Sequence, residues 1–409
     1  MTLTAILSLS LIVNLPGLAV SPMLSTLSTI FPSTTQLEKQ LLTLLPNLVI
    51  IPFVLLSGKL SLSTHKVAVI ILSLVIFTGA GVAYLFAKSM VALIVISCVF
   101  GLGAGLLTPF CTGLLADTFA GRYRMNMMGI QSGVSNIALV IGTYAVGWLS
   151  GVNWHLPFVV YLVSIIPLIF SFKLGGIPKQ DLMAPRLTAA QENDPKNDKA
   201  PEYSPIPGEK VVKGFYIGRT VQMVASYFFI TFAVMTITYY ASFVVQKYHW
   251  DDTISGTIIS LFYLFIFLPG FFLGPIVKLM KGSTIIICTF IMAIGMALMG
   301  FLHAQWSLCL GSALAGLGYG VCQPLVYDKA SRTVVTTRKS TLALAIVLTA
   351  SYVAIVLTAP IVDGFRALLG GGKYPAFSFA LSAALLLLYF FLTLWKRNSF
   401  AFNIDKSYY

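Results

Sequence analysis

The sequence predicts an all-α membrane protein with twelve transmembrane helices in two pseudo-symmetric bundles of six. Composition is the first observation, because 57% of the 409 residues are hydrophobic and only 10% are charged. Soluble domains carry about 25% charged residues, so this chain is suited to lipid rather than to water. The second observation is an internal duplication, and the third is a hydrophilic stretch between its two copies.

The duplication is clearest in residues 100–109 and 315–324. Four residues recur at a constant offset of 215, so that Gly101, Gly103, Gly105 and Pro109 correspond to Gly316, Gly318, Gly320 and Pro324. A repeat of this length indicates two half-domains rather than a solenoid. The glycines follow no predicted strand, which excludes a nucleotide-binding loop. They indicate instead helices that pack closely and can slide.

A helix needs about 20 apolar residues to cross a bilayer. Applied along the chain, this length predicts twelve spans with the approximate limits 3–30, 40–57, 67–87, 91–116, 127–150, 156–173, 215–246, 254–277, 283–302, 306–327, 341–362 and 376–396. Between the sixth and seventh spans the chain is rich in proline and mixed charges, which predicts a largely disordered linker. The expected organisation is an N-terminal bundle (1–173), a cytoplasmic linker (174–214), a C-terminal bundle (215–400) and a cytoplasmic tail (401–409).

The distribution of basic residues predicts the orientation. With the N-terminus inside, twenty lysines and arginines face the cytoplasm and five face outside, and both termini are cytoplasmic. The net charge of +13 does not indicate nucleic-acid binding, because the basic residues are spread through short loops. The N-terminus has no basic region or clear cleavage site, so we expect it to begin the first span.

The chain offers no pattern typical of an enzyme or of a cofactor site. Its five cysteines lie in apolar runs without metal-type spacing, and its four histidines lie at loop-like positions. We therefore expect no metal, no cofactor and no catalytic residue, and a monomer whose partners are the lipid bilayer and a small-molecule substrate.

Twelve spans, a basic central loop and a six-plus-six repeat resemble the major facilitator superfamily. In the loop after the second span, Gly58, Leu60 and Lys66 fit the superfamily's motif. Leu62 stands where the motif has an aspartate, and His65 stands where it has its second glycine. In families that keep this aspartate it pairs with a cytoplasmic arginine and latches the two halves, so the resemblance implies a different or weaker latch here.

Residues 101–147 are most similar to the twelve-span drug:proton antiporter branch of Gram-positive bacteria. Gly101, Gly103 and Gly105 match the glycines of its fourth helix, while Ser97 replaces an arginine associated with proton handling. The glycine series of its fifth helix is retained as Gly133, Gly142 and Gly147, without the proline. Proton coupling is therefore implied by the resemblance and not by this chain's own residues.

Charged groups inside a membrane are the usual functional markers, but all thirteen acidic residues fall in loops or at helix ends. The candidates for coupling or gating are Asp117, Arg122, Arg124, Arg219, Asp328 and Asp363. The aspartates could equally form loop ion pairs, Asp117 with Arg122 and Arg124, for example. Arg219 could bind an anionic substrate, help to close a gate, or extend to the lipid headgroups.

The resemblance implies that the first, fourth, seventh and tenth helices line a central cavity, flanked by the second, fifth, eighth and eleventh. The polar uncharged residues on these helices are the substrate-binding candidates: Asn14, Asn47, Thr108, Gln131, Asn136, Gln222, Tyr227, Tyr239, Tyr263, Gln323 and Tyr352. Each of them could instead hydrogen-bond between helices.

We predict a secondary active transporter that works by alternating access. The resemblance favours export of small apolar or amphipathic compounds in exchange for protons. Amides in a cavity suit sugars or amino acids equally well, so an importer or facilitator of a polar metabolite is the alternative. A second alternative is a flippase whose lipid or lipid-linked substrate enters from the side.

Overall fold

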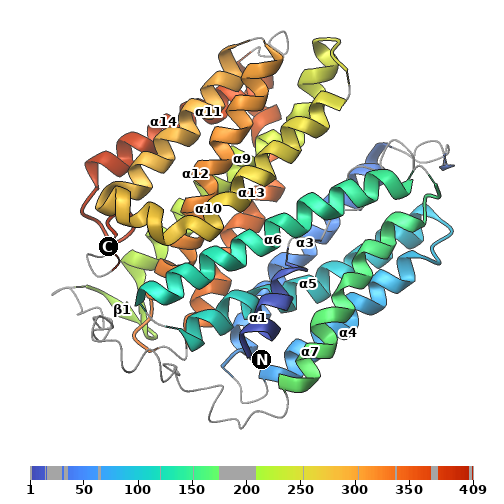
Figure 1. Ribbon diagram of the computed structural model, residues 1–409, viewed down its shortest axis with the longest axis horizontal. Helices are drawn as coiled ribbons and strands as arrows, with labels where there is room; N and C mark the ends of the chain where they lie inside the picture. Colours follow the sequence, from blue (N-terminus) through green and yellow to red (C-terminus); the bar gives the residue numbers. More distant parts are fainter. Residues whose placement is uncertain are drawn as a thin grey trace. The chain divides into compact units, whose positions relative to one another are not determined.

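The computed structural model is almost entirely helical in the part of the chain that it describes (Figure 1). It describes residues 2–13, 15, 30–31, 36–62, 66–119, 121–150, 152–174, 209–251, 253–302, 304–336, 339–369, 376–404 and 408. The predicted site residue Asn14 and most of the predicted linker lie outside these residues.

The helices before the linker are α1 (Thr2–Ser10), α3 (Gln36–Leu60), α4 (Lys66–Tyr84), α5 (Met90–Thr118), α6 (Gly121–Ser150), the 3-10 helix η1 (Leu156–Ser164) and α7 (Ile165–Leu174). A hairpin of β1 (Val211–Val212) and β2 (Phe215–Tyr216) precedes the second series. That series comprises α9 (Ile217–Lys247), α10 (Thr253–Met280), η2 (Lys281–Ser283), α11 (Thr284–Phe301), α12 (Gln305–Ser331), α13 (Ser340–Leu368) and α14 (Phe377–Trp395).

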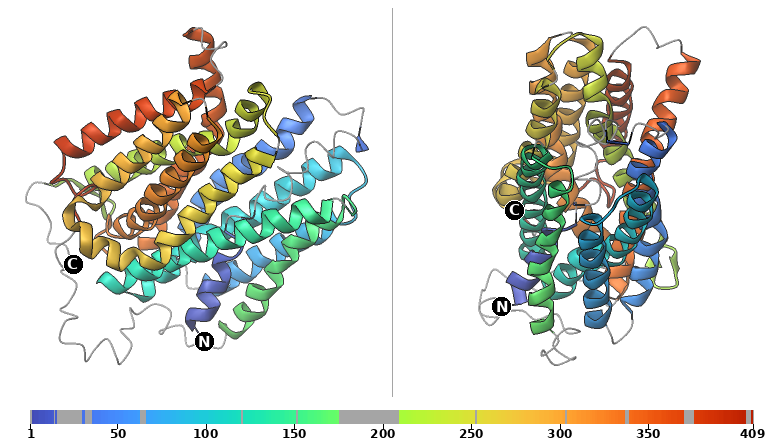
Figure 2. Two further views of the ribbon diagram at one scale, coloured as in Figure 1. Left: turned by 45° about the horizontal axis from the view of Figure 1, so that its top comes forward. Right: turned by 90° about the vertical axis from the view of Figure 1, so that its right-hand side faces the viewer.

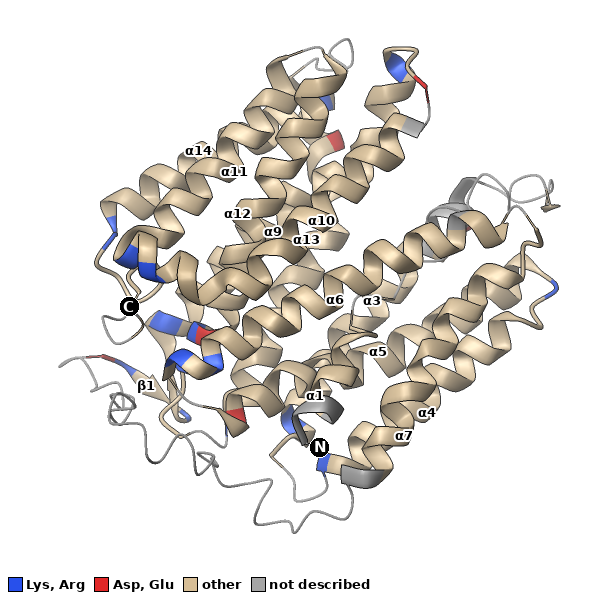
Figure 3. Cartoon of the chain, viewed as in Figure 1, with Lys and Arg blue, Asp and Glu red and all other residues tan. Residues whose placement is uncertain are grey.

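Eight helical stretches of the described residues are long and apolar enough to cross a membrane, and one of them joins α10 and α11. Two shorter apolar helices, Leu44–Leu60 and Leu156–Phe172, accompany them. Charged residues gather at the helix ends and in the connections, whereas the middles of the helices are free of them over the described residues (Figure 3). This is the distribution that a membrane imposes, because a charge at the bilayer centre is costly.

The chain forms two compact units. Unit 1 contains Met1–Thr118, Val134–Arg186 and Thr336–Tyr352, and unit 2 contains Phe119–Gly133, Leu187–Val335 and Val353–Tyr409. Two long helices, α6 and α13, each contribute one part to each unit.

The glycines of the first repeat lie where helices of unit 1 approach most closely. A Cβ on Gly101 would lie 2.6 Å from the carbonyl oxygen of Pro46 in α3, and one on Gly103 would lie 2.9 Å from the backbone nitrogen of Phe77 in α4. Only glycine permits such backbone contact, so α5 packs tightly against α3 on one face and α4 on another.

Unit 2 repeats this arrangement around α12, which packs against α10 and α11. A Cβ on Gly316 would lie 2.5 Å from the carbonyl oxygen of Phe262 in α10, and one on Gly318 would lie 2.5 Å from that of Cys288 in α11. In Figure 2 the orange and red helices α11, α12 and α14 run alongside one another. The predicted close packing at both glycine stripes is confirmed.

Several helices extend beyond their predicted limits. Helix α6 begins at Gly121 rather than near residue 127, so Arg122 and Arg124 are helical rather than in a loop. Asp117 and Asp328 likewise lie within α5 and α12. The hydropathy rule stops a span at its first charges, but a helix can continue past the apolar region when those charges find partners.

The last residues of the predicted linker are ordered. Lys213 and Gly214 form the turn of the β1–β2 hairpin with positive φ values of 51° and 81°, as two-residue hairpin turns require. The Tyr216 nitrogen donates to the Thr333 carbonyl oxygen at 2.9 Å, which ties the hairpin to the segment after α12.

Candidate functional site

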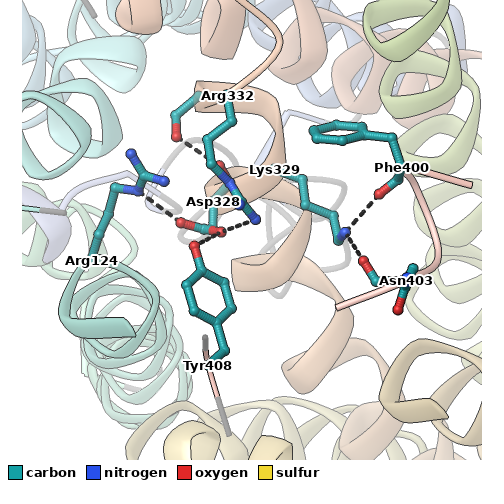
Figure 4. Close-up of polar contacts among 8 residues, drawn as sticks. Arg124, Asp328, Lys329, Arg332, Phe400, Asn403 and Tyr408 are labelled. Carbon is teal, nitrogen blue, oxygen red and sulfur yellow. Dashed lines mark hydrogen bonds and ion pairs between the residues drawn. The ribbon is translucent and has the colours of Figure 1, made fainter. Parts of the chain in front are cut away.

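A buried aspartate at the end of α12 accepts hydrogen bonds from three side chains, one four residues away and two from distant parts of unit 2 (Figure 4). Asp328 accepts hydrogen bonds from Nε of Arg124 at 2.7 Å, Nη2 of Arg332 at 3.0 Å and the hydroxyl of Tyr408 at 2.9 Å. Its side chain is only 1% exposed. We call these four residues the Asp328 cluster, and its charge-assisted bonds offset the cost of burying the carboxylate.

The members of the cluster come from three segments. Arg332 lies four residues after Asp328 on the same helical face, Arg124 comes from α6, and Tyr408 lies beyond the last helix. Burial and the nearby negative charge of Asp328 raise the pKa of Tyr408 to about 12. Its hydroxyl therefore keeps its proton at neutral pH and acts as the donor.

Lys329, the next residue of α12, turns to the C-terminal segment. Its ammonium group donates to the carbonyl oxygens of Phe400 at 2.7 Å and of Asn403 at 2.6 Å. It also lies 5.2 Å from the centre of the Phe400 ring. A lysine that is only 2% exposed needs such acceptors, because burying an ammonium group without partners is costly.

Arg219 is almost fully buried near the start of α9. It donates from Nε and Nη2 to the two carboxylate oxygens of Glu209 at 2.7 and 2.6 Å. The guanidinium also lies over the rings of Tyr216 and Phe400, at 4.3 and 5.1 Å. Glu209 lies two residues before β1, so this bidentate pair joins the end of the linker to α9.

An uncharged network lies within unit 2, one helical turn before Asp328. Gln323 accepts a hydrogen bond from Ser132 at 2.7 Å and donates to the hydroxyls of Tyr227 at 3.3 Å and Tyr327 at 3.0 Å. The two tyrosine hydroxyls are 2.7 Å apart. We call Ser132, Tyr227, Gln323 and Tyr327 the polar network, and all four side chains are buried.

Unit 1 has a buried ion pair of its own. Nζ of Lys66 at the start of α4 lies 2.8 Å from Oδ2 of Asp117 at the end of α5, and the side chains are 8% and 11% exposed. Thr341 of α13 lies 3.5 Å from the same oxygen. Oδ1 of Asp117 is buried and has no hydrogen-bond partner among the described residues.

Asp363 occupies an open position at the end of α13. It accepts a hydrogen bond from Tyr240 at 2.9 Å and lies 3.6 Å from Arg366, with 59% of its side chain exposed. Tyr240, Asp363 and Arg366, with Lys247 of α9, line an open cavity of about 460 Å³. Over the described residues, no group of three or more metal-ligating side chains is present.

The sequence matches a family profile described as "Major Facilitator Superfamily" over residues 2–189 and 223–401. This chain belongs to the major facilitator superfamily. No curated protein sequence matches it significantly.

Solved structures of major facilitator transporters share its fold. A double-tryptophan mutant of XylE is 17% identical with a TM-score of 0.73, covering 99% of this chain and 96% of that one. The proton:xylose symporter XylE bound to 6-bromo-6-deoxy-D-glucose is 16% identical with a TM-score of 0.69, and 96% of each chain is covered. The human organic anion transporter MFSD10 (TETRAN) is 16% identical with a TM-score of 0.68, covering 95% and 96% of the two chains.

The predicted fold is confirmed: this is a multi-pass membrane protein with the major facilitator fold of twelve helices in two halves. Members of the superfamily are transporters that bind small-molecule substrates in a lipid bilayer.

The structure of this superfamily member brings together only some of the predicted site residues. Tyr227 and Gln323 meet in the polar network, and Arg124 and Asp328 meet in the Asp328 cluster. Arg122 forms no ion pair within the described part of the chain, and Asp117 pairs with Lys66 instead of the expected loop arginines. The remaining uncharged candidates in unit 2 are buried or half-buried: Gln131, Gln222, Tyr239 and Tyr263.

In unit 1 the uncharged candidates are also at least half-buried: Asn47, Thr108, Asn136 and Tyr352. Thr108 donates to the carbonyl oxygen of Ala104 in its own helix at 2.8 Å, a common way to satisfy a threonine in a membrane helix. In unit 2 the side-chain oxygen of Gln222 is buried and accepts no hydrogen bond from a described residue.

Sequence reasoning missed Ser132, Tyr327, Lys66, Lys329 and Tyr408. Tyr327 follows Gln323 by four residues, so the helical period would have placed both on one face. Lys66 lies at the start of a span, where a basic residue is ordinarily assigned to the headgroups. Nothing in the sequence around Tyr408 indicates that it is buried.

Proposed function

We propose that this protein exports small apolar or amphipathic compounds in exchange for protons, working by alternating access. The observation that carries the proposal is the polar network, a buried set of hydroxyls and one amide that contains no carboxylate and no cation. A site of this chemistry suits ligands that carry one or two hydrogen-bonding groups on a largely apolar body.

The members of the polar network satisfy one another's hydrogen bonds. A substrate with a carbonyl or hydroxyl group can replace one of these bonds, for example between Gln323 and Tyr227, without leaving a buried donor unpaired. The rings of Tyr227 and Tyr327, packed edge to face with centres 5.6 Å apart, offer apolar surface to the rest of the ligand.

The crossing of α6 and α10 within unit 2 supports assignment to the antiporter branch. A Cβ on Gly129 would lie 2.6 Å from the carbonyl oxygen of Gly270, and a Cβ on Gly133 would lie 2.8 Å from the Phe271 ring. Gly133 is one of the glycines on which the resemblance to this branch depends. A close crossing of this kind allows two helices to separate and close again with little rearrangement of side chains.

Asp117 is the proposed proton carrier. It is buried beside Lys66, and one of its carboxylate oxygens has no partner among the described residues. A carboxylate that shares a buried site with a lysine can exchange a proton when water reaches it and can restore the ion pair when the water leaves.

A second candidate function is the import of a polar metabolite. The donors and acceptors of the polar network also match the hydroxyls of a sugar, and one structurally similar protein is named a proton:xylose symporter. Export and import differ in the direction of coupling, so transport measurements separate them directly.

We further propose that the protein is a monomer in a bacterial cell membrane with both termini in the cytoplasm. The excess of basic residues in the segments assigned to the inside supports this orientation. Modification of introduced surface cysteines by an impermeant thiol reagent on intact cells tests it.

Inverted membrane vesicles test the proposed function. We expect several unrelated lipophilic dyes to accumulate when the lumen is acidic, and a protonophore to abolish the accumulation. Gln323→Leu should reduce transport strongly, whereas Tyr144→Phe, at a tyrosine that is 82% exposed, should not. Failure to move any dye, together with counterflow of a sugar or amino acid, would overturn export and establish the second candidate.

A further inference from the structure

The described residues that follow the last membrane helix are packed into unit 2. Phe400, Ala401, Phe402, Ile404 and Tyr408 are each 7% exposed or less, although they follow the last membrane helix. A free polar tail would leave such side chains in water.

Contacts to these residues come from three places in unit 2. The Phe402 ring packs edge-on against Tyr389 of α14, with centres 5.8 Å apart. Phe400 lies beneath the guanidinium of Arg219 from α9, and the Tyr408 ring centre lies 5.1 Å from the guanidinium carbon of Arg332, which directly follows α12. The described residues of this segment therefore contact α9 and α14 and the residue that follows α12.

Polar contacts fix the segment to two consecutive residues of α12. Lys329 donates hydrogen bonds to the backbone carbonyl oxygens of Phe400 and Asn403 (Figure 4). Asp328 accepts a hydrogen bond from the Tyr408 hydroxyl. Asp328 is also the residue that holds Arg124 of α6. The C-terminal segment thus contacts the same carboxylate that joins α6 to α12.

We infer that residues 400–404 and Tyr408 form an intramolecular clasp, and that Tyr408 is a positioning residue that stabilises the Arg124–Asp328 contact. While that contact is closed, Asp328 is buried and water does not replace the Tyr408 hydroxyl. When α6 and α12 separate, water reaches the carboxylate and the hydroxyl becomes dispensable. The clasp therefore favours the closed state over the open one.

In this inference, the surface that holds residues 400–404 and Tyr408 binds them as it would bind a peptide. Two hydrogen-bonding groups make this surface specific: Lys329 donates to backbone carbonyl oxygens, and Asp328 accepts from one tyrosine hydroxyl. A peptide with the sequence of residues 397–409 should therefore bind to the same surface in a protein that lacks this segment.

The test measures the distance between spin labels at position 123 of α6 and position 335 after α12, by electron–electron double resonance. Both native side chains, Tyr123 and Val335, are exposed. The labels are attached to the untruncated 409-residue chain after its five native cysteines are replaced. We expect Tyr408→Phe to shift the ratio of open to closed populations by roughly tenfold or more toward the open state, the value of a hydrogen bond to a charged group.

Truncation after Ser399 should produce a larger shift, and the added peptide should reverse it. A peptide carrying phenylalanine at the position of Tyr408 should reverse it less, which separates a specific contact from general stabilisation. Unchanged distances in a folded Tyr408→Phe protein would overturn the inference, as would equal rescue by the two peptides. These distances do not depend on which substrate is transported, so the clasp and the proposed function can fail separately.

Discussion

Removing either partner of the Arg124–Asp328 pair should destabilise the protein, and by different amounts. Loss of one partner of a buried ion pair costs about 3–5 kcal/mol, because a charge is left without compensation. Arg124→Ala leaves Asp328 with Arg332 and Tyr408, at 3.0 and 2.9 Å, so about 3 kcal/mol is expected. Asp328→Ala removes the acceptor of all three donors, so about 5 kcal/mol is expected.

The chain provides a matched control for this comparison. Asp363 pairs with Arg366 at 3.6 Å, but its side chain is 59% exposed. Exposed pairs of this kind contribute about 0–1 kcal/mol, so Asp363→Ala should have little effect on unfolding. The two aspartates then differ in burial rather than in the type of contact.

Unfolding of the purified protein can be followed with a dye that fluoresces on reaction with thiols. Cys111, Cys288 and Cys322 are buried and react only after the helices separate. The unfolding free energy should fall most in Asp328→Ala, less in Arg124→Ala and least in Asp363→Ala. The variant with both Arg124→Ala and Asp328→Ala should lose less unfolding free energy than the sum of the two single losses. The difference should be about 0.5–3 kcal/mol, because the two residues are in contact.

Two outcomes would refute this reasoning. If the Arg124→Ala and Asp328→Ala effects add within about 0.5 kcal/mol, the two side chains are not coupled. If Asp363→Ala is as harmful as Asp328→Ala, burial is not the source of the cost.

Two further predictions concern transport. Gly103→Leu and Gly318→Leu should abolish transport at normal surface expression, since a side chain would displace the backbone of α4 or α11. Gly79→Leu is the control, because a Cβ at this position meets nothing within 4 Å. Wild-type transport rates in the first two variants would contradict the close-packing argument. Asp117→Asn should uncouple transport from the pH gradient while counterflow of substrate persists, measured in proteoliposomes; a gradient response equal to that of the wild type would exclude Asp117 as the proton carrier.

The helices and their closest contacts could be predicted because both are encoded locally. A run of apolar residues defines a span, and a glycine stripe defines a face that another helix can approach. The repeat doubled this information, since the same offset that aligns Gly101 with Gly316 also aligns their partners in α3 and α10 to within one residue. These features depend on patterns of fewer than about 20 neighbouring residues.

The polar sites could be predicted only in part, because their partners are far apart in sequence. Arg124 and Asp328 were both candidates, but 204 residues separate them and each has nearer residues of opposite charge. Lys66 was predicted to lie in a loop and Asp117 in a loop or at a helix end, since hydropathy cannot distinguish a terminal charge in water from one that is paired. The burial of Tyr408 could not be predicted at all, because a short tail has no hydrophobic periodicity.

Near the ends of α5 and α12, the equivalent positions of the two repeats contact a neighbouring helix in different ways. The offset of 215 places Gly113 of α5 at the position that Asp328 occupies in α12. A Cβ on Gly113 would lie 2.6 Å from Cγ2 and 2.8 Å from Cβ of Thr341 in α13, whereas Asp328 forms an ion pair with Arg124 in α6. One copy therefore depends on shape at this position, and the other depends on charge.

The close contact at Gly113 predicts that one added methyl group has opposite effects at Gly113 and at Gly79, which has no neighbour within 4 Å. Gly113→Ala forces the new Cβ against Thr341, and overpacking of this kind costs about 1–3 kcal/mol. Gly79→Ala places a methyl group in open space within α4, so only the gain in helix propensity, about 0.5–1 kcal/mol, remains. Both variants share that gain, so their difference in unfolding free energy isolates the contact of α5 with α13. Equal stabilities would show that α13 can withdraw from Gly113 at no cost, and the contact would then be too loose to hold this end of the helices closed.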